Sequence, residues 1–76
     1  MTEEDRKGPL GFGNRVRRLR TARNLTQSAL ANELRCVQAS IADWESGKFY
    51  PGFWKIIELA KYFGVDTDYL LGMSQV

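Results

Sequence analysis

The sequence predicts a compact all-α domain of five short helices. Apolar residues recur at the three- and four-residue spacing of a helix, residues that cap or end helices separate these segments, and no segment reads as a credible strand. The 76 residues leave room for one domain, and 43% of them are hydrophobic, which is enough for a modest core. We expect residues 1–10 to be a flexible tail, residues 11–72 to fold and residues 73–76 to be a C-terminal tail.

The first predicted helix runs from Asn14 to Arg23. Phe12, Val16 and Leu19 form one apolar stripe along it, and arginines fill its other faces. Asn24 can end this helix because asparagine tolerates the left-handed backbone conformation found at helix ends.

Two shorter helices are predicted to follow. Thr26 is suited to cap the segment from Gln27 to Leu34, because its hydroxyl can accept a hydrogen bond from a first-turn N–H group. The helical pattern resumes from Gln38 to Glu45, and Gly47 ends it because glycine accepts a positive φ.

The last two predicted helices run from Phe53 to Phe63 and from Thr67 to Leu71. Gly64 closes the longer helix, Asp66 caps the shorter one and Gly72 stops it. The longer helix carries a broad apolar face made of Phe53, Ile56, Ile57, Leu59, Ala60 and Phe63.

Composition indicates a binding function and not a catalytic one. The chain has no histidine, so its single cysteine, Cys36, lacks an activating base, and it also lacks a disulfide partner and neighbouring metal ligands. Gly8, Gly11 and Gly13 are interpreted as a flexible lead-in, because no strand precedes them and no phosphate-loop Lys-Ser/Thr pair follows. No bilayer-length apolar stretch or signal-peptide pattern is present. We therefore expect a cytoplasmic, non-membrane protein that is not an enzyme and needs no cofactor.

Positive charge is concentrated near the start of the chain, although the formal net charge is only +2. Most of the basic residues lie in the first third, at Arg6, Lys7, Arg15, Arg17, Arg18, Arg20 and Arg23. A basic segment of this kind fits a surface that faces phosphates. An ordinary solvated helix face explains it equally well, so charge alone does not separate the two interpretations.

Two short helices joined by a three-residue break, Arg35 to Val37, have the outline of a helix-turn-helix. The residues in and around this unit resemble the phage repressor/Cro-type helix-turn-helix family over about residues 12 to 72. The resemblance rests on an ordered set of short motifs at these spacings: Arg17-Arg18-Leu19-Arg20, Leu25-Thr26-Gln27, Leu30-Ala31, Leu34, Ile41, Trp44-Glu45-Ser46-Gly47-Lys48, Pro51, Leu59-Ala60, Gly64-Val65 and Leu70-Leu71-Gly72.

The resemblance implies a lambda-repressor-like fold and sequence-specific binding to double-stranded DNA by a transcriptional regulator, a repressor acting by operator occupancy. The segment from Gln27 to Leu34 would cross the DNA backbone, and the segment from Gln38 to Glu45 would be the recognition helix in the major groove. We also expect a homodimer on an inverted-repeat operator whose half-sites lie about 34 Å apart. The expected dimer surface comprises Tyr69, Met73 and Val76, with Trp54 as a further candidate.

The candidate DNA-binding residues are Arg15, Gln27, Ser28, Gln38, Ala39, Ser40, Ala42, Asp43 and Lys48. Gln38 can bond adenine bidentately, and Asp43 can accept a hydrogen bond from cytosine. Gln27 matches a family glutamine whose amide bonds a phosphate and braces the recognition helix. Lys48 follows that helix and is expected to meet a phosphate. The set is poor in positive charge.

Arg20 and Glu45 match a family ion pair that joins the first helix to the end of the third. A guanidinium–carboxylate pair at this place would clamp the recognition helix. The resemblance therefore gives Arg20 a structural role. The remaining candidates for phosphate contacts in this region are Arg15, Arg17, Arg18 and Arg23.

Two residues depart from the family pattern. Arg35 occupies a turn position where the family often has Gly, and it either reaches a phosphate or is simply exposed. Val37 stands where a Ser or Thr cap is common, and the missing cap costs about 1 kcal/mol. Cys36, between them, is expected to fill the core as a small hydrophobe.

The two tryptophans are expected to differ. Trp44 should be buried between the third and fourth helices. Trp54 falls outside the apolar face of its own helix, so it either contacts a partner or packs partly against Phe49 or Tyr50.

A second function class fits the same residues. Because the third helix is poor in positive charge, the domain could instead be a protein-interaction module with little DNA binding, whose partner is an antirepressor, a toxin or a polymerase subunit. Salt-dependent binding to mixed-sequence duplex DNA separates the two functions.

Overall fold

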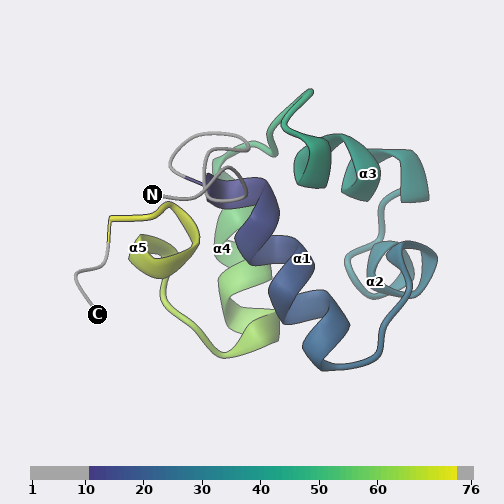
Figure 1. The fold of residues 1–76 in the computed structure, drawn as a ribbon, viewed down its shortest axis with the longest axis horizontal. Coiled ribbons are helices and arrows are strands. Elements are labelled where there is room, and N and C mark those ends of the chain that lie inside the picture. Colours follow the sequence, from purple (N-terminus) through teal and green to yellow (C-terminus); the bar gives the residue numbers. More distant parts are fainter. Residues whose placement is uncertain (1–10, 74–76) are drawn as a thin grey trace.

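The structure, a computed structural model, describes residues 11–73, and all of its regular elements are helices. They are α1 (Phe12–Ala22), α2 (Gln27–Glu33), α3 (Gln38–Ser46), α4 (Phe53–Phe63) and α5 (Thr67–Leu70). Figure 1 shows α1 running diagonally across the molecule, with α2 and α3 on one side and α5 on the other. The all-α, five-helix prediction is confirmed. Of the tails predicted at 1–10 and 73–76, residues 1–10 and 74–76 lie outside the described residues, and Met73 is exposed.

Every helix contributes to one apolar core. Phe12 and Val16 of α1 meet residues from the other four helices, and Trp44 is buried as predicted. Cys36 packs against this core while remaining half-buried. The buried apolar residues are Phe12, Val16, Leu30, Ala31, Leu34, Ile41, Trp44, Leu59, Ala60, Phe63 and Leu70. Between residues 11 and 73, no helix has the length and apolar character that spanning a membrane requires.

The helix ends follow the capping residues predicted from the sequence. The Thr26 hydroxyl accepts a hydrogen bond from the Ala29 N–H group at 3.0 Å, and Asp66 accepts one from the Tyr69 N–H group at 3.0 Å. Asn24 has a left-handed φ of 57°, as expected of a residue that ends a helix.

Arg35 keeps the backbone conformation that a glycine would adopt more easily. Its φ is 56°, and such a conformation costs a non-glycine residue about 1 kcal/mol. The residue is exposed. The turn between α2 and α3 therefore retains its left-handed geometry despite the departure from the family pattern.

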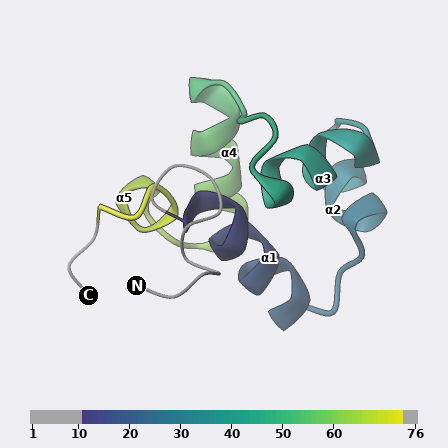
Figure 2. The same cartoon turned by 45° about the horizontal axis from the view of Figure 1, so that its top comes forward.

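Phe53 does not join the core, contrary to the predicted apolar face of its helix. Its side chain is 70% exposed and lies against the Trp54 ring, with 5.3 Å between centroids. Phe53 is the first residue of α4, and this end of the helix projects beyond α1 (Figure 2). Only from Ile56 onward does the apolar face of α4 pack against the core. Trp54 is 78% exposed, so neither Phe49 nor Tyr50 buries it.

Gly11 and Gly13 are not a flexible lead-in. Helix α1 begins two residues earlier than predicted, directly after Gly11, whose φ is 82°. Gly13 is buried in the first turn, where an added Cβ would lie 2.5 Å from the carbonyl oxygen of Glu45 and 2.6 Å from that of Trp44. Gly13 therefore allows α1 to approach the backbone at the end of α3. Gly8 lies outside the described residues.

Candidate nucleic-acid interface

Helices α2 and α3 form the two-helix unit that the sequence predicts, and α3 packs on both α2 and α1. The inner side of α3 is buried through Ile41, Trp44 and Glu45. Its outer side carries the candidate residues predicted for base contacts. Gln38 and Ala39 are exposed there, whereas Ser40, Ala42 and Asp43 are half-buried.

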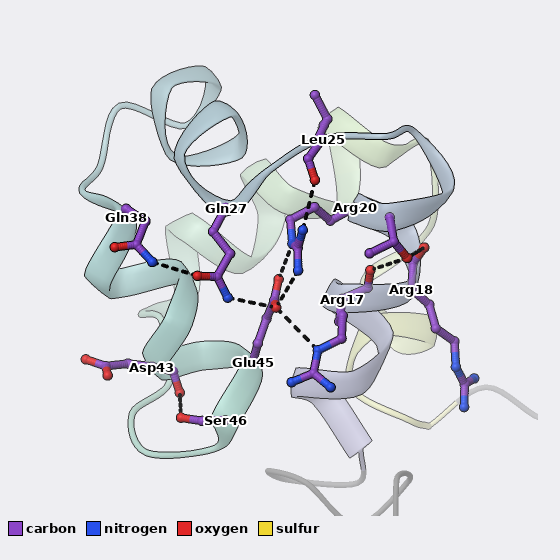
Figure 3. Close-up of polar contacts among 10 residues, drawn as sticks. Arg17, Arg18, Arg20, Leu25, Gln27, Gln38, Asp43, Glu45 and Ser46 are labelled. Atoms are coloured by element: carbon purple, nitrogen blue, oxygen red, sulfur yellow. Dashed lines mark hydrogen bonds and ion pairs between the residues drawn. The ribbon is translucent and has the colours of Figure 1, made fainter.

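A buried ion pair holds the C-terminal part of α3 against α1. Arg20 donates from Nε to Oε2 of Glu45 at 2.6 Å and from Nη2 to Oε1 at 2.9 Å, which is a bidentate geometry (Figure 3). Only 1% of the Glu45 side chain is exposed. Arg20 also donates from Nη1 to the carbonyl oxygen of Leu25 at 2.8 Å. One guanidinium thus joins α1, the α1–α2 loop and α3.

The partners of Glu45 keep its carboxylate charged. Burial by itself would raise the pKa of Glu45, but hydrogen bonds from Arg20 and Gln27 and the positive charge of Arg20 outweigh it and hold the pKa below its ordinary value. The hydrogen bond to Glu45 correspondingly raises the pKa of Arg20. A buried carboxylate is stable here because its oxygens are satisfied by charged and polar donors.

A relay of side-chain amides extends from this ion pair to the exposed start of α3. Gln27 donates from Nε2 to Oε1 of Glu45 at 3.1 Å, and Gln38 donates from Nε2 to Oε1 of Gln27 at 2.6 Å (Figure 3). Because Glu45 can only accept, it orients the Gln27 amide, and Gln27 in turn orients Gln38.

Arg17 is a member of this network that the sequence does not identify. It was expected only as one of several candidates for phosphate contacts, yet its Nε lies 3.5 Å from Oε1 of Glu45. Arg17 and Arg20 are three positions apart on α1, so they share one helix face, and this is the signal that could have linked them. The Arg17 side chain remains 41% exposed, which leaves it within reach of solvent and of ligands.

The remaining candidate residues surround this network without joining it. Lys48 follows α3, where its backbone N–H donates to the carbonyl oxygen of Asp43 at 2.9 Å. The Asp43 carboxylate points away from Glu45 (Figure 3). Ser28 is exposed in the first turn of α2. The Arg15 guanidinium lies over the ring of Tyr69, 5.9 Å from its centroid, so the structure links Arg15 to α5.

Two basic residues hold helix ends in place. Arg23, a sequence candidate for phosphate contact, donates to the carbonyl oxygens of Tyr62 and Phe63 at 3.0 and 3.1 Å and so caps the end of α4. Lys55 donates from Nζ to the carbonyl oxygen of Leu34 at 2.7 Å, at the end of α2. Neither contact is visible in the sequence, because both join segments far apart along the chain.

Cys36 is a free, half-buried thiol. Burial raises the pKa of its thiol, which favours the protonated form. Within residues 11–73 no group of His, Cys, Asp or Glu side chains is placed to hold a metal ion.

Comparison with known proteins agrees with this geometry. A family described as a helix-turn-helix domain matches residues 13–73. The HTH-type transcriptional activator BcrR of Enterococcus faecalis is 42% identical over 65 residues, which cover 86% of this chain and 32% of that protein. The uncharacterized HTH-type transcriptional regulator YobD of Bacillus subtilis is 33% identical over 63 residues, which cover 83% of this chain and 56% of that protein.

The SPbeta prophage-derived uncharacterized HTH-type transcriptional regulator YonR, also of Bacillus subtilis, is 32% identical over 60 residues, which cover 79% of this chain and 56% of that protein. The chain thus spans between about a third and just over half of the length of these relatives. No solved structure gives a significant match to it. Since the family match covers most of the chain and coincides with the α2–α3 unit and its supporting helices, the chain belongs to the helix-turn-helix domain family.

Proposed function

We propose that this chain is the DNA-binding domain of a transcription regulator that reads double-stranded DNA with α3 in the major groove. In the specific form of the proposal, the regulator is a phage repressor-like protein that binds an inverted-repeat operator as a homodimer and represses by occupying it. The observation that carries the proposal is the relay from the Arg20–Glu45 pair through Gln27 to Gln38, which presents an oriented amide at the exposed start of α3.

The chemistry of this amide suits adenine. One Nε2–H of Gln38 is taken by Gln27, so the second Nε2–H and the Oε1 atom remain for a ligand. Adenine presents N7 as an acceptor and N6 as a donor in the major groove, and glutamine pairs with both at once. A pair of this kind discriminates against the wrong base by about 1–3 kcal/mol.

Phosphate contacts would come from the surroundings of the two helices. Val37 provides no side-chain cap, so no capping side chain occupies the start of α3, where a helix N-terminus favours a phosphate. Lys48 is exposed just beyond the other end of α3, and Arg17 lies beside the network on α1. Because few of these groups are charged, we expect modest affinity with a shallow salt dependence, since each phosphate that is neutralised adds only about 1 to the salt slope.

Two observations bear on whether the regulator represses or activates transcription. The resemblance to phage repressors and the prophage origin in the name of YonR favour repression, whereas the name of BcrR describes an activator. Activation is therefore the second candidate. A reporter gene with the selected site placed within or upstream of its promoter separates the two outcomes.

The test of DNA reading compares Gln38→Ala with Lys48→Ala. A duplex site is first selected from a random pool with the wild-type chain, and salt titrations then follow on that site and on a scrambled duplex. Gln38→Ala should lose about 1–3 kcal/mol on the selected site and relax the preference at one base pair, while its non-specific affinity stays the same. Lys48→Ala should weaken binding to both duplexes and reduce the salt slope by about 1.

These two variants serve as controls for one another, since Gln38→Ala removes an uncharged amide proposed to contact a base and Lys48→Ala removes a positive charge proposed to contact a phosphate. An equal, sequence-independent loss from both would reduce Gln38 to a phosphate contact. If neither variant changes binding, α3 does not face DNA. In that case, or if the wild-type chain selects no site, a protein-interaction function takes the place of DNA reading.

A further inference from the structure

Four aromatic side chains are exposed between the end of α3 and the first turn of α4. Phe49, Tyr50, Phe53 and Trp54, together named the aromatic edge, are 59%, 45%, 70% and 78% exposed. All four lie within six consecutive residues. Phe53 and Trp54 stack edge to face with 5.3 Å between centroids, and Tyr50 lies edge-on to the core ring of Phe12 with 6.4 Å between centroids. Single exposed apolar residues are normal on a protein surface, whereas a cluster of aromatic rings marks an interaction site.

The aromatic edge adjoins the helix that is proposed to read DNA. It begins two residues after Gly47, which ends α3, and it continues into the first turn of α4. Figure 2 shows α3 lying between α2 and this end of α4. On the α2 side the exposed residues include Ser28, Asn32 and Glu33, which are polar. The two flanks of α3 therefore differ: among residues 11–73 the large exposed aromatic side chains follow α3, whereas Val37, in the turn before it, is aliphatic.

We propose that the aromatic edge is the surface through which two copies of this chain contact each other on DNA. The inference rests on the proposed function. Recognition helices on an inverted repeat lie about 34 Å apart, and this molecule measures 30 × 24 × 22 Å. Two copies on one face of the duplex thus leave a narrow gap that surface side chains can bridge. A two-fold contact brings the same patch of each copy together, and a largely uncharged aromatic patch is complementary to itself.

The exposed area of the aromatic edge indicates whether the contact can form in solution or only on DNA. With about 200 Å² for a full aromatic side chain, the edge exposes about 500 Å² per copy, or about 1,000 Å² for a pair. Stable interfaces bury about 1,200–2,000 Å². The contact is too small to hold a dimer in solution, but it suffices when DNA fixes both copies at high effective concentration. The chain is therefore a monomer when free and binds two half-sites cooperatively.

This surface takes the place of the one expected around α5. Tyr69 is half-buried and lies next to the Arg15 guanidinium, which leaves it a poor anchor for a partner. Val76 lies outside the described residues. Met73 is 62% exposed and belongs to a different part of the chain, so it provides a control.

The test uses the full chain and three duplexes: the selected inverted repeat, the same duplex with one half-site scrambled, and one with about five base pairs, half a helical turn, inserted between the half-sites. The wild-type chain should fill the two half-sites cooperatively and lose this cooperativity on the inserted duplex. The double substitution Phe53→Ala/Trp54→Ala should reduce affinity for the inverted repeat about tenfold and leave affinity for the single half-site unchanged. Met73→Ala should change neither.

Each other outcome overturns the inference in a recognisable way. Unchanged cooperativity in the double variant assigns the aromatic edge to another partner, such as a further segment of a longer protein. An equal loss on the single half-site assigns the edge to DNA itself. Wild-type binding without cooperativity removes the dimer contact. In contrast, a wild-type chain that binds no duplex in a salt-dependent manner overturns the proposed function and not only this surface.

Discussion

The two ends of α3 are built in opposite ways. At the C-terminal end Glu45 is buried and bonded to Arg20, Gly13 brings α1 into backbone contact, and Gly47 closes the helix in a left-handed conformation. At the N-terminal end Val37 is 65% exposed and provides no side-chain cap. The helix is anchored where it leaves the proposed interface and left accessible where its N–H groups would meet DNA.

The anchoring contributes orientation more than stability. A buried ion pair is often no more stable than an apolar replacement of the same volume, because desolvation offsets the attraction between the charges. An apolar pair could pack in this place, but it could not accept a hydrogen bond from Gln27. We infer that the charge of Glu45 matters because it sets the direction of the amide relay that ends at Gln38.

The largest effect is expected at the anchored end, from Glu45→Ala. This substitution leaves the Arg20 guanidinium charged, largely buried and without its carboxylate, so it should lower the free energy of unfolding by about 3–5 kcal/mol. Urea denaturation of the two proteins measures the difference. Asp43→Ala, a carboxylate on the same helix that points away from the network, is the matched control and should change little. A Glu45→Ala chain with unchanged melting would show that the pair does not anchor α3.

Acid should also weaken the Arg20–Glu45 pair. The loss of stability should be smaller than for Glu45→Ala, because the protonated Glu45 side chain still fills its place. The folded-state pKa of Glu45 is lowered from its ordinary value of 4.5, so its stabilising contribution is complete above about pH 4.5 and is lost as the pH falls through the lowered value. Stability curves of the wild-type chain and Glu45→Gln between neutral and strongly acidic pH isolate this contribution. Parallel curves for the two proteins would contradict it.

Gly13→Ala should destabilise the close approach of α1 to α3 by about 1–3 kcal/mol, because the new methyl group would meet two backbone carbonyl oxygens that cannot rotate away. In an isolated helix the same substitution would be stabilising, since alanine is favoured over glycine by about 0.5–1 kcal/mol. Gly52→Ala is the matched control, because nothing lies within 4 Å of the added carbon. Thermal melting of both variants distinguishes the two expectations. A higher melting temperature for Gly13→Ala would show that α1 and α3 move apart easily.

The smallest effect is expected at the open end, from Val37→Ser. The new hydroxyl can cap α3 and should raise the free energy of unfolding by about 0.5–1 kcal/mol, or a few degrees in melting temperature. The reverse change at the start of α2, Thr26→Ala, removes an existing cap and should cost about 1 kcal/mol. If both variants melt as the wild type does, capping does not distinguish the two helix starts.

Local signals in the sequence were sufficient for the helices and their ends. The periodicity of apolar residues located all five helices, and Thr26, Asp66 and Asn24 marked ends that the structure confirms, because a cap acts within one turn of its own helix. The same signals misplaced Phe53, since periodicity assigns a residue to a helix face without showing whether another element reaches that end of the helix.

The sequence by itself determined that the chain is an all-α domain with a helix-turn-helix outline, because turn chemistry and helical spacing are local properties. Only the tertiary structure decided how Gln38 is oriented, what Arg23 and Lys55 bond to, and why Gly13 is a glycine. Each of these depends on groups that are far apart in the chain and meet only when the helices pack. Hydrogen bonds and close contacts act over a few ångströms, so their partners are set by the packing of the whole domain and not by any one segment.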